Sequence, residues 1–317
     1  MAPYPDIAYA LKEGSRFLLR VVPVFALAVY AADLAGRLGW LSGLAWLAGP
    51  VMRLGRLSPD CGPGFVTSVV SPTAGHALLA DLRLAGKLDR RELAVAAVVN
   101  NLPGEIATGK SVLPLALPVL GFFGAAYYGA LLAASALKAL LMLLAGRLIL
   151  PPRVHAAPRT APASPASFRT AARASVKPSL KTIAKVLKTM VPVAYIVYFL
   201  ISAGFFDRAA GPLAFMTDYI PLNPAVLPVV AARLISPPGA YTVAGGLYAA
   251  GAATGWELVL GLFAGAFAAT ATSLRYTVPY YFAIFGAADG TVIIAASMAS
   301  RAAAYGAVLL GLILLIS

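Results

Sequence analysis

A pattern of serine, proline, glycine and glutamate occurs twice in this sequence, at a constant distance of 165 positions. Ser71-Pro72, Gly86 and Glu92-Leu93 match Ser236-Pro237, Gly251 and Glu257-Leu258. The same offset then pairs Lys110 with Arg275, Pro114 with Pro279 and Gly121 with Gly286. Because chance rarely preserves such a register, we predict two copies of one structural unit.

The duplication also fixes the expected domain boundaries. Residues 11–24 match residues 180–193 at an offset of 169, which extends the similarity upstream. The intervening segment is rich in Pro, Ala, Ser and Arg and has no apolar periodicity. We therefore predict a first repeat over residues 1–150, a basic linker over 151–178 and a second repeat over 179–317.

The apolar content of the chain exceeds what one soluble core could bury. Hydrophobic residues make up 60% of the sequence and charged residues 12%, and the mean hydropathy is +0.83. Gly124–Leu150 and Ala302–Ile316 approach or reach the length of a bilayer crossing and carry few charges. We predict an all-α polytopic protein of the cell membrane, with the lipid bilayer as a partner and no nucleic-acid ligand, since the basic residues flank apolar segments.

The basic residues predict the orientation of the chain. Residues 151–188 carry eight Lys and Arg residues, and no acidic residue occurs between Ile106 and Phe206, so this segment is expected to be cytoplasmic. Residues 83–91 carry four basic residues, whereas the matching residues 248–256 carry none. This asymmetry favours repeats of inverted topology over parallel repeats.

Prolines interrupt both copies where membrane helices would be expected. They are accompanied by glycine or serine at Gly62-Pro63-Gly64, Ser71-Pro72, Pro103-Gly104 and Pro114, and again at Pro228, Ser236-Pro237 and Pro279. A broken helix leaves backbone N–H and C=O groups that lipid cannot satisfy, so such breaks occur beside protein or a wet cavity. We predict a shared polar chamber; the alternative is a packed bundle with simple proline kinks.

These segments resemble a known family. The run from Gly39 to Arg56 contains Trp-x-x-Gly-Pro-x-x-Arg-Leu-Gly, and it is followed by Ser71-Pro72, a polar loop and the proline-rich region from Asn100 to Pro118. Together they resemble the Gate, or nucleoside-recognition, domain of spore-maturation proteins and of the membrane part of ferrous-iron permeases. The resemblance implies re-entrant or broken helices and a transport role. Unlike the iron permeases, the chain has Val69-Val70-Ser71 before Pro72, and its only cysteine is Cys61.

Charged residues at membrane depth are costly and are therefore candidates for function. An inverted repeat would bring Lys110 and Arg275 together, and two converging cations favour an anion; alternatively, both extend to the membrane surface. Glu105, beside Asn100 and Asn101, could bind a cation, carry a coupling proton or pair with Lys110. Asp289 could pair with Arg301 or Arg275.

Polar side chains near the breaks complete the predicted binding site. His76 and Tyr241 occupy equivalent positions and could donate hydrogen bonds to a solute, although a lone histidine is more often structural. Serine and threonine hydroxyl groups at the breaks and in the second copy could also form hydrogen bonds with a solute. The remaining candidates are Ser71, Thr73, Ser236, Thr270, Thr272 and Ser273.

Gly104–Ser111 fits the phosphate-loop pattern G-x-x-x-x-G-K-[ST]. Such a loop normally leads from a strand into a helix, and here Pro114 and Pro118 follow. We interpret the match as coincidental for nucleotide hydrolysis, although its amides could still hold an anion. We expect no enzyme activity, no cofactor and no resident metal.

We therefore predict a secondary transporter of a small polar or anionic solute, coupled to H⁺ or Na⁺ and able to form a homodimer. The first alternative is a divalent-metal permease similar to a ferrous-iron permease. The second is a membrane scaffold without transport, or an enzyme acting on lipid phosphate.

Overall fold

The computed structural model describes residues 7–38, 48–152, 167–203 and 222–316. Over these ranges the secondary structure is helical and contains no strand, which confirms the predicted all-α class. Two helical segments, Phe122–Ile149 and Thr277–Ile316, are long and apolar enough to cross a membrane. The first part of the Gate-like run, residues 39–47, lies outside the described residues.

The first half of the chain contains one long helix followed by short helices and then two longer ones. These elements are α1 (Ile7–Arg37), α2 (Ala48–Leu54), the 3-10 turn η2 (Pro59–Cys61), α3 (Gly62–Val70), α4 (Pro72–Leu84), α5 (Arg90–Val99), α6 (Asn101–Leu120) and α7 (Phe122–Ile149).

The second half has a similar order of elements: α8 (Phe168–Ser202), η4 (Pro224–Val226), α10 (Leu227–Ile235), α11 (Pro237–Ala249) and α12 (Gly255–Ile316). A non-helical residue, Gly286, divides α12 into two arms. Positive φ angles, which favour glycine, occur at Gly86 and Gly121 in the first half and at Gly251 and Gly286 in the second. The start points of α3 and α10, and of α4 and α11, are also 165 positions apart.

The Ser-Pro elements end one helix and begin the next, as their sequence predicts. Ser71 and Ser236 have extended backbone angles because proline disfavours helical geometry in the preceding residue. Each serine hydroxyl accepts a hydrogen bond from the first turn of the following helix, at Ala74 N and Gly239 N, both at 3.3 Å. These two serines are therefore helix caps.

Pro63 and Pro228 lie at the starts of α3 and α10, where helices begin as predicted. At Pro114 and Pro279 the predicted breaks are absent, because the helices continue through them. Pro114 lies inside α6, and Pro279 lies inside the first arm of α12. Pro103 lies in the first turn of α6, where a missing N–H group costs no helical hydrogen bond. Pro114 is buried in the packed interior.

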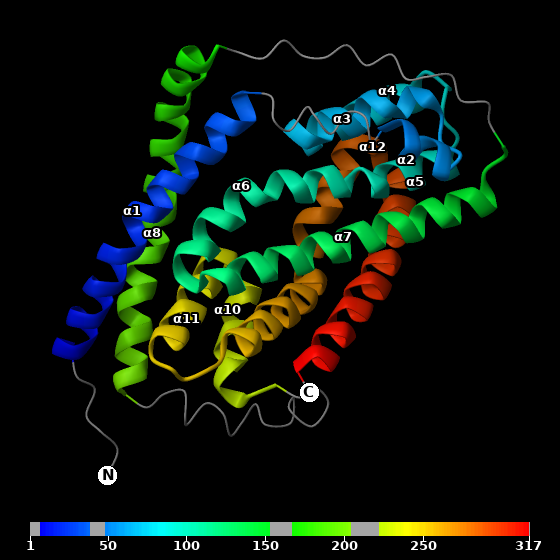
Figure 1. Ribbon diagram of the computed structural model, residues 1–317. Coiled ribbons are helices and arrows are strands. Elements are labelled where there is room, and N and C mark those ends of the chain that lie inside the picture. Colours follow the sequence, from blue (N-terminus) through cyan, green and yellow to red (C-terminus); the bar gives the residue numbers. More distant parts are fainter. Residues whose placement is uncertain (1–6, 39–47, 153–166, 204–221, 317) are drawn as a thin grey trace.

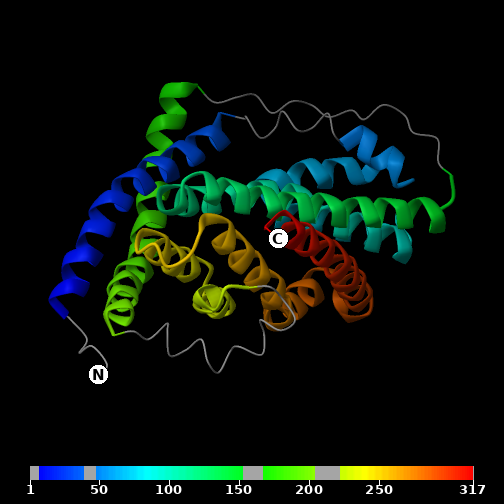
Figure 2. The same ribbon diagram turned by 60° about the horizontal axis from the view of Figure 1, so that its bottom comes forward.

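Helices α1 and α8 lie against each other and run in opposite directions (Figures 1 and 2). Ser15 Oγ and Tyr195 Oη are 3.0 Å apart, and Tyr30 Oη donates to Ala172 O at 3.3 Å near the other end of the pair. Residues 168–178, predicted as part of the linker, form the first turns of α8. They are rich in alanine, a strong helix former, and they pack against α1.

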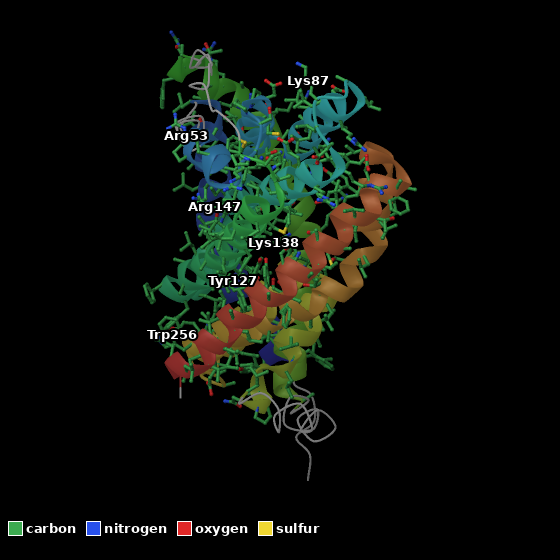
Figure 3. The ribbon with its side chains drawn as sticks, turned by 90° about the vertical axis from the view of Figure 1, so that its right-hand side faces the viewer. Arg53, Lys87, Tyr127, Lys138, Arg147 and Trp256 are labelled. Atoms are coloured by element: carbon green, nitrogen blue, oxygen red, sulfur yellow. The ribbon has the colours of Figure 1, made fainter. Side chains whose placement is uncertain are left out.

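The α3–α4 hairpin and the α10–α11 hairpin lie on opposite sides of the central helices α6, α7 and α12 (Figure 1). Lys87, after α4, and Trp256, at the start of α12, consequently lie at opposite ends of the molecule (Figure 3). The two halves therefore place their corresponding loops at opposite ends.

At each end, residues of the two helices that flank a loop of one half contact a long helix of the other half. Asp289 accepts from Arg83 Nε at 2.9 Å and from Arg90 Nε at 2.8 Å, so among the described side chains its ion-pair partners are these two residues and not Arg301. At the other end, Phe123 forms edge-to-face contacts with Tyr248 and Trp256. The contact between the halves is therefore ionic at one end and aromatic at the other.

Candidate functional site

A cavity of about 530 Å³ lies where α4, α6, α7 and both arms of α12 meet. We call it the first cavity. Three kinds of side chain line it: charged groups, hydroxyl or amide groups, and tyrosine rings. They are Thr73, His76, Asn101, Glu105, Thr108, Ser135, Lys138, Thr277, Tyr280, Tyr281, Ser297, Arg301 and Tyr305, with Pro72, Gly104 and Met298.

Lys138 is the buried cation of this site. Its side chain comes from the middle of α7, and the residue is 6% exposed. Its Nζ donates to Ser297 Oγ at 2.8 Å, and Ser297 belongs to the second arm of α12. Because an ammonium group has three N–H donors, this hydrogen bond uses one of them. A lysine held in this way positions a positive charge beside the cavity.

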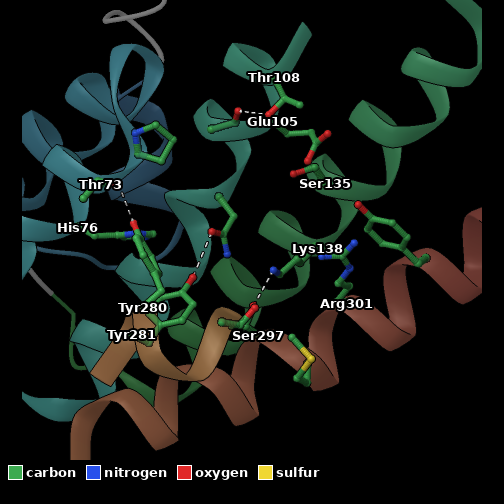
Figure 4. Close-up of a pocket in the computed structure, with 16 residues that line it drawn as sticks. Thr73, His76, Glu105, Thr108, Ser135, Lys138, Tyr280, Tyr281, Ser297 and Arg301 are labelled. Carbon is green, nitrogen blue, oxygen red and sulfur yellow. Dashed lines mark hydrogen bonds between the residues drawn. The ribbon is translucent and has the colours of Figure 1, made fainter. Parts of the chain in front are cut away.

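Arg301 supplies a second cation from the second arm of α12. Its guanidinium carbon lies 4.5 Å from the centre of the Tyr305 ring, in a cation–π contact. Its Nε is buried and makes no hydrogen bond to the described residues. Figure 4 shows the heads of Lys138 and Arg301 directed into the same space. A buried donor without a partner is rare in proteins.

Glu105, from α6, is the single carboxylate among the residues that line the first cavity. Its backbone is held by Tyr128 Oη, which donates to the carbonyl groups of Glu105 at 3.3 Å and Ile106 at 3.0 Å. No ion pair within 4 Å joins Glu105 to Lys138 or Arg301 in the described structure. Because the lining has two basic side chains and one carboxylate, it carries an excess of positive charge.

The far side of the cavity is polar and aromatic. His76 Nε2 donates to Ala97 O at 3.1 Å, since a carbonyl can only accept, and His76 Nδ1 lies 3.0 Å from Tyr280 Oη. Tyr280 Oη also lies 3.4 Å from Thr73 Oγ1. Tyr281 Oη donates to Asn101 Oδ1 at 3.3 Å. These bonds orient two tyrosine rings toward the cavity from the first arm of α12 (Figure 4).

Several residues predicted to bind solute meet at this cavity, and others do not. Thr73, His76, Asn101 and Glu105 line it. Tyr241 lines a second cavity, of about 340 Å³, which Glu105 also lines. Asn100 is buried beside α6, with its Nδ2 lacking a hydrogen-bond partner in the described structure.

The remaining predicted residues have other positions. Lys110 is exposed and is not part of the lining of either cavity. Ser273 Oγ donates to Thr270 O at 2.7 Å, while Thr270 Oγ1 is buried without a partner among the described residues. The side chains of Thr272 and Arg275 lie outside the described part of the structure.

The phosphate-loop-like segment, residues 104–111, lies within helix α6. Most of its amide groups are consequently used in the helix and do not form an anion-binding loop.

Sequence reasoning missed Lys138 as well as the site role of Arg301, Tyr280, Tyr281 and Ser297. A signal for the two cations was present. Lys138 is the only charged residue between Lys110 and Arg147, and Arg301 is the only one after Asp289. A single charge inside a long apolar helix indicates a functional position. Nothing in the sequence indicated that these two positions face each other.

The known proteins that this chain resembles in sequence have no stated function. Three proteins of Methanocaldococcus jannaschii, each described as uncharacterized, are similar to this chain. One is 24% identical over 274 residues, covering 86% of this chain and 88% of its own length. Two others are 22% identical, covering 90% of both chains in one case and 85% and 89% in the other. No family model matches the chain, and no solved structure matches it significantly.

Proposed function

We propose that this protein is a secondary membrane transporter of a small organic anion, and that the first cavity binds the anion. The observation that carries the proposal is the pair Lys138 and Arg301, two cations from different halves of the chain that line one cavity with a single carboxylate. Carboxylate or phosphate groups are the partners that such cations recognise.

A membrane location is supported by the surface of the long helices. Large apolar side chains are exposed on α1, α7, α8 and α12, which would be unfavourable in water over so many positions. Examples, each at least 60% exposed, are Leu19, Leu27, Leu148, Leu180, Leu310 and Leu314. The two long apolar helices agree with this location.

We further propose that the two halves are homologous repeats of inverted topology, similar to the Gate domain. The 165-residue spacing of the positive-φ glycines and the helix starts supports homology. The antiparallel pair α1 and α8 and the opposite placement of the two hairpins support inversion (Figure 1). In such transporters the solute site lies between the repeats near the middle of the membrane.

The size and lining of the cavity indicate the class of solute. A cavity of about 530 Å³ falls in the range of sites for small organic molecules, roughly 300–1,000 Å³. The cations would bind a carboxylate or phosphate, while Tyr280 and Tyr281 offer ring faces and the amide of Asn101 offers hydrogen bonds. We propose an organic anion with an uncharged body, of which a nucleoside monophosphate is one example.

A divalent-metal permease fits this cavity less well. Among the described residues, no group of three or more His, Cys, Asp or Glu side chains could hold a metal ion. The two cations that flank Glu105 would also repel a divalent cation.

The test is uptake into proteoliposomes of three radiolabelled probes: succinate, inorganic phosphate and uridine monophosphate. We expect uptake of succinate or uridine monophosphate, and we expect Lys138→Gln and Arg301→Gln each to lower it about tenfold or more because the charge that holds the anion is lost. Arg147→Gln is the control, since Arg147 lies exposed on the same helix as Lys138 and should retain full uptake.

Two results would contradict the proposal. One is a reconstituted protein that neither binds nor transports any of the three probes. The other is uptake that survives both charge-removing substitutions unchanged. Release of phosphate or diacylglycerol from the vesicle lipids, measured in the same samples, would instead identify an enzyme acting on lipid phosphate.

A further inference from the structure

The second cavity, of about 340 Å³, adjoins the first and has its own cation. Four residues line both cavities: Glu105, Thr108, Arg301 and Tyr305. They lie between the two spaces as a common wall. Because Arg301 lines both cavities, an anion bound in either cavity could contact it.

Arg233 is the cation that lines only the second cavity. It comes from α10, and its Nε donates to Tyr127 Oη at 3.4 Å. Tyr127 in turn packs edge-to-face against Tyr241, with ring centres 5.8 Å apart. A guanidinium group has five N–H donors and this hydrogen bond uses one. The side chain is therefore oriented by tyrosines, and it adds a positive charge to the second cavity.

The two cavities have a similar charge pattern. The first is lined by Lys138 and Arg301 with Glu105, and the second by Arg233 and Arg301 with Glu105. Each therefore has two cations and one carboxylate among its lining residues. Hydroxyl groups of Thr108 and Ser111 complete the polar lining of the second cavity.

The hairpin starts that border the cavities also correspond. Pro72, Thr73 and His76 of α4 line the first cavity, and Pro237, Pro238 and Tyr241 of α11 line the second. These residues are 165 positions apart in pairs. The equivalent parts of the two halves thus border equivalent spaces on the two sides of the shared wall.

We infer that the second cavity is a second binding site for the same class of organic anion, and that Arg301 holds the anion as it moves between the cavities. In this step the anion exchanges Lys138 for Arg233 while Arg301 remains its partner. Glu105 limits how tightly the anion is held, because it repels a negative charge in both positions. The inference rests on the proposed transport function and deepens it.

Cysteine protection tests occupancy of each cavity separately. Cys61 is the only cysteine and is buried, so Cys61→Ser gives a background for single replacements. Met298→Cys reports on the first cavity and Ser111→Cys on the second, because each residue lines one cavity only. The rate of modification by a negatively charged methanethiosulfonate is measured with and without succinate, inorganic phosphate or uridine monophosphate.

We expect a probe that is transported to slow modification at both positions by about fivefold or more, as saturation above Kd requires. Arg233→Gln should remove protection at Ser111→Cys and leave protection at Met298→Cys. Protection at Met298→Cys alone, with Arg233→Gln transporting normally, would overturn the second site and leave the proposed function intact. Protection at neither position, with no uptake, would overturn the proposed function and the second site together.

A pair of variants at Ser111, one charged and one neutral, avoids the risk that Arg233→Gln fails to fold. Ser111 is exposed at the second cavity, so Ser111→Glu adds a negative charge with little change in packing. Uptake should fall about tenfold relative to the matched Ser111→Gln variant because the added carboxylate repels the anion. Equal uptake by these two variants would contradict an anion pathway through the second cavity.

Discussion

A buried lysine usually costs stability, and Lys138 is retained in an otherwise apolar helix. If its role is to bind an anion, Lys138→Met should abolish uptake. It should also raise the free energy of unfolding by roughly 1 kcal/mol, which raises the thermal unfolding midpoint in detergent by a few degrees. Thermal unfolding followed by tryptophan fluorescence and proteoliposome uptake measure the two effects. A variant that unfolds at a lower temperature would show that Lys138 serves mainly to hold α7 against α12.

At the scale of helices, the α3–α4 hairpin depends on close approach at Gly75. A Cβ there would collide with Ser68 Oγ and with the carbonyl of Gly64, so Gly75→Ala should destabilise the protein by about 1–3 kcal/mol. Gly129, on the exposed face of α7, has open space around its Cβ position, and Gly129→Ala should stabilise slightly, by up to about 1 kcal/mol. Thermal unfolding of the two variants side by side checks this; equal effects would contradict the close packing.

For the whole molecule, the proposed inverted repeats would place the α4–α5 loop and the α11–α12 loop on opposite sides of the membrane. In the Cys61→Ser background, Lys87→Cys and Ala252→Cys put one thiol in each exposed loop. In right-side-out vesicles a membrane-impermeant maleimide should label Ala252→Cys, and it should label Lys87→Cys only after permeabilisation, since the proposed topology puts the basic loop on the cytoplasmic side. Labelling of both from one side would contradict the inverted topology.

Much of the helix pattern was predictable because it depends on local chemistry. The residue before a proline avoids helical geometry, so the breaks after Ser71 and Ser236 follow from two adjacent residues. The positions of Gly121 and Gly286 likewise mark points where the chain needs a positive φ angle. Pro114 and Pro279 were misread as breaks because their accommodation depends on the surrounding packing.

The candidate site was predicted in part, and the reason lies in the distance between its residues along the chain. Thr73, His76, Asn101 and Glu105 follow the first Ser-Pro break closely enough for local reasoning to find them. Lys138 and Arg301, the cations that line the same cavity, lie far from this break in sequence, and the predicted cation Lys110 is exposed. Periodicity does not tell which face of α7 packs against α12.

The sequence by itself determined the helical class, the 165-residue spacing of its matching elements and the serine-capped starts of α4 and α11, because each depends on neighbouring residues or on a repeated pattern. Only the tertiary structure decided that Lys138 and Arg301 share a cavity and that Asp289 pairs with Arg83 and Arg90. Both outcomes are set by how long helices pack against each other, which depends on the three-dimensional fit of many side chains at once.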